Sequence, residues 1–261
     1  MDDRVKSCCA GFYELPLIQS LLGDQWHPGG PALTRKLAGA VLVGRGSRVL
    51  DVASGHGESA RVLSQHFGCH VTGVDYSADN CTHANAMANE TGLTEKIHFV
   101  DGDAEDLPFA EDTFDVVICE CSLCVFPNRS TALDEIRRVL RPGGRLGISD
   151  VVVNQAIPLS LQDLFGQVLC IGGALSVDGY RDAFAAAGFS SIRSRDASTA
   201  LNDMIDRIER RAGNMKEFLG TRNLELQPGW LVSRSSIVEA RDFVRNGGVG
   251  YALITGRKPR D

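Results

Sequence analysis

Eight cysteines are the most reactive feature of this 261-residue chain, and four of them fall in two short segments. Cys119, Cys121 and Cys124 follow a run of β-type residues, and Cys170 lies in the apolar segment VLCIGGAL. Thiolates bind soft ions, so converging thiols predict a site for a metal or a thiol-seeking metalloid. In an extended strand, Cys119 and Cys121 would point to the same face.

Two other interpretations of these cysteines stay open. Free cysteine often packs as a small buried hydrophobe, in which case the chain acts on an ordinary organic molecule. The C-x-C-x-x-C spacing also allows zinc, although a buried strand end is a poor place for a zinc knuckle. The N-terminal sequence MDDRVKSCCAGFYE lacks the apolar core of an export signal, so we expect a cytoplasmic protein with reduced thiols.

Acidic residues end three predicted strands and form the second chemical group. Asp51 ends the first, Asp75 the second, and Asp103 follows the third. A carboxylate at Asp75 can accept hydrogen bonds from both hydroxyls of a ribose, and one at Asp103 can accept from an adenine amino group. Gly55 and Gly57 follow the first strand and let a ligand approach the backbone at a helix N-terminus. Together these residues indicate a nucleoside-containing cofactor.

The elements that position these residues alternate between strand and helix from Ser47 onward. This alternation predicts an α/β fold with a mostly parallel sheet and helices on both faces. We expect a helical N-terminal cap over residues 1–45. Residues 46–261 would form the cofactor-binding domain, with inserts at about 155–176 and 198–248. The last strand, over residues 250–257, can pair antiparallel beside the strand at 189–196.

Composition narrows the classes of partner. The chain is 43% hydrophobic and 23% charged, as globular proteins are, and its net charge of −6 and lack of basic runs argue against nucleic acid. No apolar run reaches the length of a membrane span. We therefore expect a small-molecule or metalloid substrate and neither nucleic acid nor membrane as partner. The oligomeric state is not predicted.

Five segments together resemble the successive motifs of the Rossmann-like, class I S-adenosylmethionine-dependent methyltransferases. They are DVASGHG, GVDYS, GDAEDLPF, TFDVVICECSL and EIRRVLRPGGRLGISD, and they cover residues 48–150. The resemblance implies a seven-stranded sheet and S-adenosylmethionine as cofactor. It also implies cofactor contacts from Asp51, Ala53, Gly55, Gly57, Asp75, Tyr76, Asp103, Ala104 and Cys119. Ala53 stands where the family usually has glycine.

A narrower resemblance covers residues 115–190. The segments FDVVICECSLCVFPN, ISDVVV and VLCIGGAL resemble the arsenite methyltransferase family, whose members methylate arsenic for detoxification. This resemblance implies that Cys121 and Cys170 are the catalytic, arsenic-binding cysteines and that Cys8 or Cys9 assists as a further substrate ligand. It also implies a thiol reductant of the glutathione or thioredoxin type as co-substrate. Trivalent arsenic held by sulfur keeps a lone pair that can attack the methyl group.

Two alternatives to arsenic methylation remain at this point. One is a methyltransferase acting on O, N or C of a small organic metabolite, and the other is a non-catalytic protein that binds the cofactor or a metalloid. Two polar residues are also ambiguous. His27 can line the pocket or satisfy a backbone carbonyl, and Glu120 can face the cofactor or be a solvated loop charge.

Overall fold

A computed structural model describes most of the chain. It covers residues 6, 11, 18, 20, 22–23, 26–162, 170–214, 224–227, 230–232 and 234–260. Cys8 and Cys9, predicted to assist in substrate binding, lie outside the described residues. So does the stretch 163–169 of the apolar segment before Cys170.

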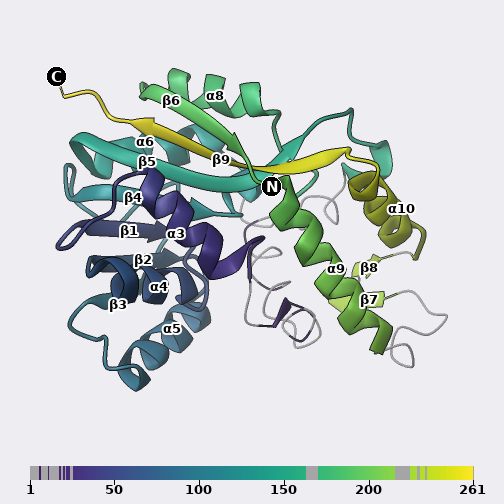
Figure 1. The fold of residues 1–261 in the computed structure, drawn as a ribbon, viewed down its shortest axis with the longest axis horizontal. Helices are drawn as coiled ribbons and strands as arrows, with labels where there is room; N and C mark the ends of the chain where they lie inside the picture. The colour runs from purple at the N-terminus through teal and green to yellow at the C-terminus, as the bar shows by residue number, and fades with distance from the viewer. Residues whose placement is uncertain are drawn as a thin grey trace.

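A seven-stranded sheet forms the centre of the molecule (Figure 1). Its spatial order is β3 (Ile97–Asp101), β2 (His70–Asp75), β1 (Arg48–Val52), β4 (Phe114–Glu120), β5 (Leu140–Val153), β9 (Val249–Arg257) and β6 (Ser190–Asp196). The first five strands are parallel, and β9 pairs antiparallel with both β5 and β6. The predicted fold class is confirmed, as is the place of the last strand beside the sixth.

Helices cover both faces of this sheet (Figure 1). One face carries α3 (Gly30–Ala40), α4 (Glu58–Phe67) and α5 (Ala78–Glu90), and the other carries α6 (Arg129–Val139) and α8 (Val177–Ala186). The short 3-10 helices are η1 (Leu123–Val125) and η2 (Leu159–Leu161). The remaining elements are α9 (Ser198–Asn214), α10 (Arg234–Arg245) and the hairpin of β7 (Leu224–Gln227) and β8 (Trp230–Val232). Among the described residues, no helix is long and apolar enough to cross a membrane.

Alternate residues of each central strand supply the two hydrophobic cores. In β4, Val116 and Ile118 pack beneath α3 and α4, whereas Val117 and Cys119 pack on the side of α6 and α8. This alternation explains why the strand is apolar at nearly every position, as parallel strands covered on both faces are. Helix α3 shares the first core through Leu37, so this part of the predicted cap is built into the domain.

The expected common face of Cys119 and Cys121 is wrong. Strand β4 ends at Glu120, and Cys121 adopts a left-handed backbone conformation with φ of 57°. The two-residue period of a strand stops there, so Cys121 packs against the core of α3 and α4 while Cys119 stays in the opposite core. The backbone turn thus separates the two thiols and brings Cys121 to the end of the sheet.

We predict that Ile118→Ala lowers the free energy of unfolding by about 2–5 kcal/mol, because Ile118 is fully buried and its truncation leaves a cavity. Ile118→Val should cost only about 0.5–1.5 kcal/mol. Urea denaturation measures both values. Leu159→Ala is the control, since Leu159 is 86% exposed. An equal effect of Ile118→Ala and Leu159→Ala would contradict the assignment of this core.

Candidate functional site

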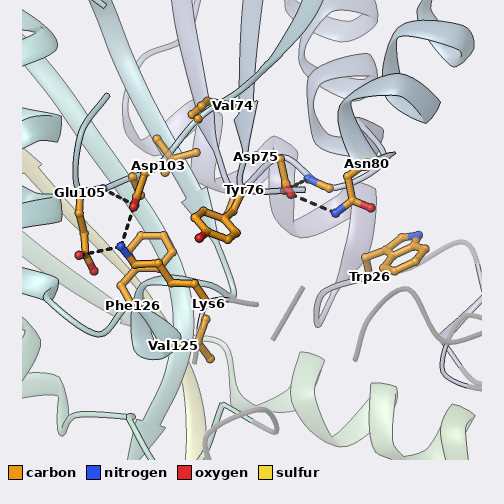
Figure 2. Close-up of a pocket in the computed structure, with 15 residues that line it drawn as sticks. Lys6, Trp26, Val74, Asp75, Tyr76, Asn80, Asp103, Glu105, Val125 and Phe126 are labelled. Carbon is orange, nitrogen blue, oxygen red and sulfur yellow. Dashed lines mark hydrogen bonds and ion pairs between the residues drawn. The ribbon is translucent and has the colours of Figure 1, made fainter. Parts of the chain in front are cut away.

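A cavity lies at the carboxyl ends of β1, β2 and β3 (Figure 2). It measures about 170 Å³, and its lining includes four predicted cofactor residues beyond the glycine turn: Asp75, Tyr76, Asp103 and Ala104. Open α/β sheets bind ligands at this edge. The cavity therefore gathers residues that the sequence places in three separate motifs.

Asp75 is held rigidly at the centre of this cavity (Figure 2). One carboxylate oxygen, Oδ2, accepts a hydrogen bond from the backbone N–H of Gly55 at 2.7 Å. The other, Oδ1, accepts from the N–H of Ser77 and from Nδ2 of Asn80, both at 3.0 Å. Asp75 is only 8% exposed. Its fixed orientation suits it to accept hydrogen bonds from ribose hydroxyls, and Ser77 also caps α5 through Asn80.

Asp103 is paired with a lysine that sequence reasoning did not find. Lys6 Nζ lies 2.6 Å from Asp103 Oδ2 and 2.8 Å from Glu105 Oε2 (Figure 2). Partial burial alone lowers the pKa of Lys6, but its hydrogen bonds to the two carboxylates outweigh this and raise the pKa. A lone lysine before the first recognisable element carries no sequence signal, so only the fold reveals that it lines the cofactor cavity.

The turn after β1 shows why the family usually has glycine at position 53. Ala53 adopts a φ of 57°, a left-handed conformation that costs a non-glycine residue free energy. Gly55 has open space where a side chain would stand, which leaves room for a ligand. Gly57 lines neither cavity, and an added Cβ there would lie 2.5 Å from Phe99 Cζ. The structure thus gives Gly57 a packing requirement, and its cofactor role stays a prediction.

A smaller cavity of about 70 Å³ continues from the first. The two share Trp26, Ala53 and Gly55, and the smaller one extends to Asp51, Glu120 and Cys121. Glu120 is 8% exposed, so it is not a solvated loop charge.

His27 satisfies both interpretations of the sequence. It lines the smaller cavity, and its Nδ1 donates to the Pro28 carbonyl at 3.1 Å.

The cysteine pair meets at the end of β4. Cys121 Sγ and Cys170 Sγ lie 3.9 Å apart, although 49 residues separate them in sequence. Both residues have left-handed backbones, with φ of 57° and 63°, a strained conformation of the kind found at functional sites. The hydrogen bond with Cys170 and burial raise the pKa of the Cys121 thiol well above its usual value.

The other cysteines at this end are buried. Cys124 is 2% exposed, and burial together with its hydrogen bond to Cys170 raises the pKa of its thiol. Cys119 is fully buried and lines neither cavity. Within the described ranges, no three His, Cys, Asp or Glu side chains are arranged to hold a metal ion.

The order of the sheet defines an open α/β protein. The turn after β1 and the acids at the next two strand ends are arranged to bind a nucleoside cofactor. Comparisons with known proteins identify the family. Residues 50–148 match the family described as a methyltransferase domain. The 27-O-demethylrifamycin SV methyltransferase of Amycolatopsis mediterranei (strain S699) is 30% identical over 93% of this chain and 93% of its own length. The chain belongs to the class I S-adenosylmethionine-dependent methyltransferases.

Two further similarities bear on the fold and the acceptor. An arsenite methyltransferase of Halobacterium salinarum (strain ATCC 700922 / JCM 11081 / NRC-1) is 35% identical, but over 59% of this chain and 40% of its own length. The crystal structure of the [4+2]-cyclase SpnF superposes with a TM-score of 0.82 at 23% identity, covering 100% of this chain and 98% of that one. The second similarity concerns the fold alone.

The described residues fit S-adenosylmethionine. Asp75 is positioned to accept from the ribose, and Gly55 leaves open space beside it. Asp51, 2% exposed, lines the adjoining cavity, and its Oδ2 has no hydrogen-bond partner within the part of the chain that the structure describes, as expected where a ligand supplies the donor. When bound, the cofactor supplies an electrophilic methyl group, and the protein aligns the acceptor and excludes water.

We predict that Asp75→Ala weakens the binding of S-adenosylmethionine by about 2–3 kcal/mol, because charge-assisted hydrogen bonds to the ribose are lost. Isothermal titration calorimetry measures this change. Asp101→Ala is a matched control, since Asp101 pairs with Asp75 in the sheet register but is exposed and lines neither cavity. Unchanged affinity in a folded Asp75→Ala variant would show that the ribose binds elsewhere.

Proposed function

We propose that this protein transfers a methyl group from S-adenosylmethionine to thiol-bound trivalent arsenic, as arsenite or methylarsenite. The observation that carries the proposal is the approach of Cys121 and Cys170 to 3.9 Å beside the cofactor cavities. Because thiolate sulfur binds a tetrahedral ion at ~2.3 Å, two sulfurs on one such ion lie about 3.8 Å apart. Taking this bond length as a guide for arsenic, the pair can hold one atom with little movement.

The protonation of these thiols is compatible with arsenite as substrate. The raised pKa of Cys121 keeps its thiol neutral until a soft ligand displaces the proton. When two thiols react with arsenite, two As–S bonds form and two hydroxyl groups leave as water with the thiol protons. The leaving hydroxyl groups take up the thiol protons, so no separate base is needed. Burial of the thiol pair therefore does not prevent the exchange.

Cys121 lines the smaller cavity together with Ala53 and Gly55, which supports the proposal that arsenic bound to it would lie beside the cofactor site. The arsenic lone pair forms the new As–C bond as the methyl–sulfur bond breaks. Arsenic is oxidised to the pentavalent state in this step. A thiol reductant of the glutathione or thioredoxin type returns it to the trivalent state, and Cys8 or Cys9 assists as a further ligand.

One observation favours a second candidate, a methyltransferase for an organic acceptor. The relative that aligns over 93% of the chain is named for O-methylation of a rifamycin, whereas the arsenite methyltransferase aligns over 59%. In that case Cys121 and Cys170 are packing residues. An assay separates the two candidates by incubating the purified protein with S-adenosylmethionine, glutathione and either arsenite or an organic extract. Methyl transfer to arsenite supports the first candidate, and transfer only to the organic extract supports the second. Cofactor or arsenic binding without a methylated product would instead indicate a non-catalytic binding protein.

We predict that Cys121→Ser and Cys170→Ser each reduce arsenic methylation at least a hundredfold while S-adenosylmethionine affinity changes less than about threefold, because hydroxyl oxygen is a poor ligand for a soft ion. Element-specific mass spectrometry of the products measures the first quantity and calorimetry the second. Cys69→Ser is the control, because Cys69 is a fully buried cysteine that lines neither cavity. Normal turnover in both site variants would exclude arsenic as the acceptor.

A further inference from the structure

Strand β6 ends the sheet on one side and leaves its outer edge open (Figure 1). All of its residues are exposed except Ile192, which is half-buried. Within the described residues, the backbone of β6 pairs with β9 and with no other strand. The N–H and C=O groups on the far side of β6 can therefore pair with a strand of another chain.

Two arginines of β6 point to the same face of the sheet as helix α3. Arg193 pairs with Thr255 of β9, and Arg195 pairs with Leu253. Leu253 belongs to the core of α3 and α4, and paired residues of adjacent strands share a face. Ile192 packs in the opposite core, as the alternation along a strand requires. Because both arginines are exposed, no described helix covers this part of the face.

Two more arginines continue this group into the inner strands. Arg257 lies two residues after Thr255 in β9 and is therefore on the same face. It pairs directly with Arg145 of β5, and both side chains are half-buried. We call the four residues the arginine face: Arg145, Arg193, Arg195 and Arg257.

The arginine face carries positive charge that no described carboxylate balances. Arg141 pairs with Asp115 at 2.5 Å, but none of the four arginines forms an ion pair within the part of the chain that the structure describes. Arg257 Nε donates instead to the Gly143 carbonyl at 3.3 Å. The chain has 33 acidic residues against 27 lysines and arginines, so this local excess does not follow from composition.

Holding these charges together is unfavourable. Arg145 and Arg257 lie directly opposite each other, and like charges in that position destabilise a sheet. Burial, and then repulsion from Arg257, Arg260 and Arg141, lower the pKa of Arg145 below its usual value. Charged residues on an edge strand can prevent aggregation, which accounts for the arginines of β6. It does not account for Arg145, which is two strands in from the edge.

An added strand would match this face in both spacing and charge. Neighbouring strands lie about 4.8 Å apart, and alternate residues of one strand lie about 6.8 Å apart. A strand beside β6 therefore sets every second side chain next to Arg193 and Arg195. Carboxylates at those positions would form charge-assisted hydrogen bonds with the guanidinium groups, while the main chain pairs with the open edge.

Two other occupants fit this edge less well. A second copy of this chain that paired through its own β6 would bring its arginines beside these, and like charges repel. A nucleic acid offers phosphates to the arginines but has no backbone N–H and C=O groups to pair with the strand edge.

We propose that β6 and the arginine face bind an extended acidic segment of a partner protein. The segment adds to the sheet as a strand and directs alternate Asp or Glu side chains to the arginines. Its negative charge also offsets the repulsion between Arg145 and Arg257. The proposal does not depend on which acceptor is methylated.

Fluorescence anisotropy with two labelled decapeptides tests this interface on the whole protein. Both peptides consist of Glu and Thr in equal numbers, alternating in one and arranged as two blocks in the other. Because only the alternating strand directs all its carboxylates to one face, we expect it to bind at least about fivefold more tightly than the block peptide. N-methylation of its whole backbone keeps the charge and removes the N–H donors, so it should abolish binding.

Arg193→Gln and Arg195→Gln should each weaken binding of the alternating peptide about threefold to fivefold, the upper range for one exposed ion pair. Arg181→Gln is the matched control, because Arg181 is an exposed arginine of α8, which covers the opposite face. It should leave the affinity unchanged.

Several results would overturn the proposal. Absence of binding by either peptide would remove the interface. Equal binding of both peptides, or binding that survives N-methylation, would show electrostatic attraction without strand addition, and equal weakening by Arg181→Gln would place the contact elsewhere. Tighter binding of an oligothymidylate would assign the face to nucleic acid. A wild-type dimer that the alternating peptide dissociates in sedimentation would assign the edge to a second copy.

Discussion

Parallel pairing of β3, β2, β1 and β4 is the constraint on which this site depends. Parallel strands end at the same edge, so residues that close separate β-α units meet there. Because β1 pairs with its two neighbours, three motifs that are distant in sequence line one cavity. Without this register, Asp75 could not receive the N–H of Gly55, and the turn after β1 would lose its anchor.

The carboxylates at this edge repel one another, and only some of them have a cationic partner. At one end Lys6 pairs with both Asp103 and Glu105 and offsets one of their two charges, and Glu58 is balanced by Arg61. At the other end Glu120 accepts from the hydroxyls of Thr34 and Ser59, and Asp51 Oδ2 has no hydrogen-bond partner among the described residues. Burial, and then the neighbouring carboxylates, raise the pKa of Asp51 well above its usual value, and its Oδ2 is left for a donor that a bound ligand can supply.

In the proposed acceptor site, two strained backbone turns, and not paired charges, hold the thiols in place. Cys121 and Cys170 both hold left-handed conformations that the surrounding packing must maintain, and these turns direct the two sulfurs toward each other. Cys124 and Cys119, with ordinary burial, remain in the interior. The acceptor proposal therefore concerns two particular thiols and not the number of cysteines in the chain.

The sequence by itself determined the fold class and the cofactor-binding edge. The features that carried these predictions are local. They are the period-two apolar patterns, the acids at strand ends and Gly55, and each can be recognised within its own stretch of sequence. The sequence could not determine which face of the sheet Cys119 and Cys121 point to, because the left-handed backbone at Cys121 ends the alternation of side chains between the two faces. Nor could it find Lys6, or choose between the two environments of Glu120. Those contacts join residues 97 and 86 positions apart, and only the packing of the N-terminal elements against the sheet decides them.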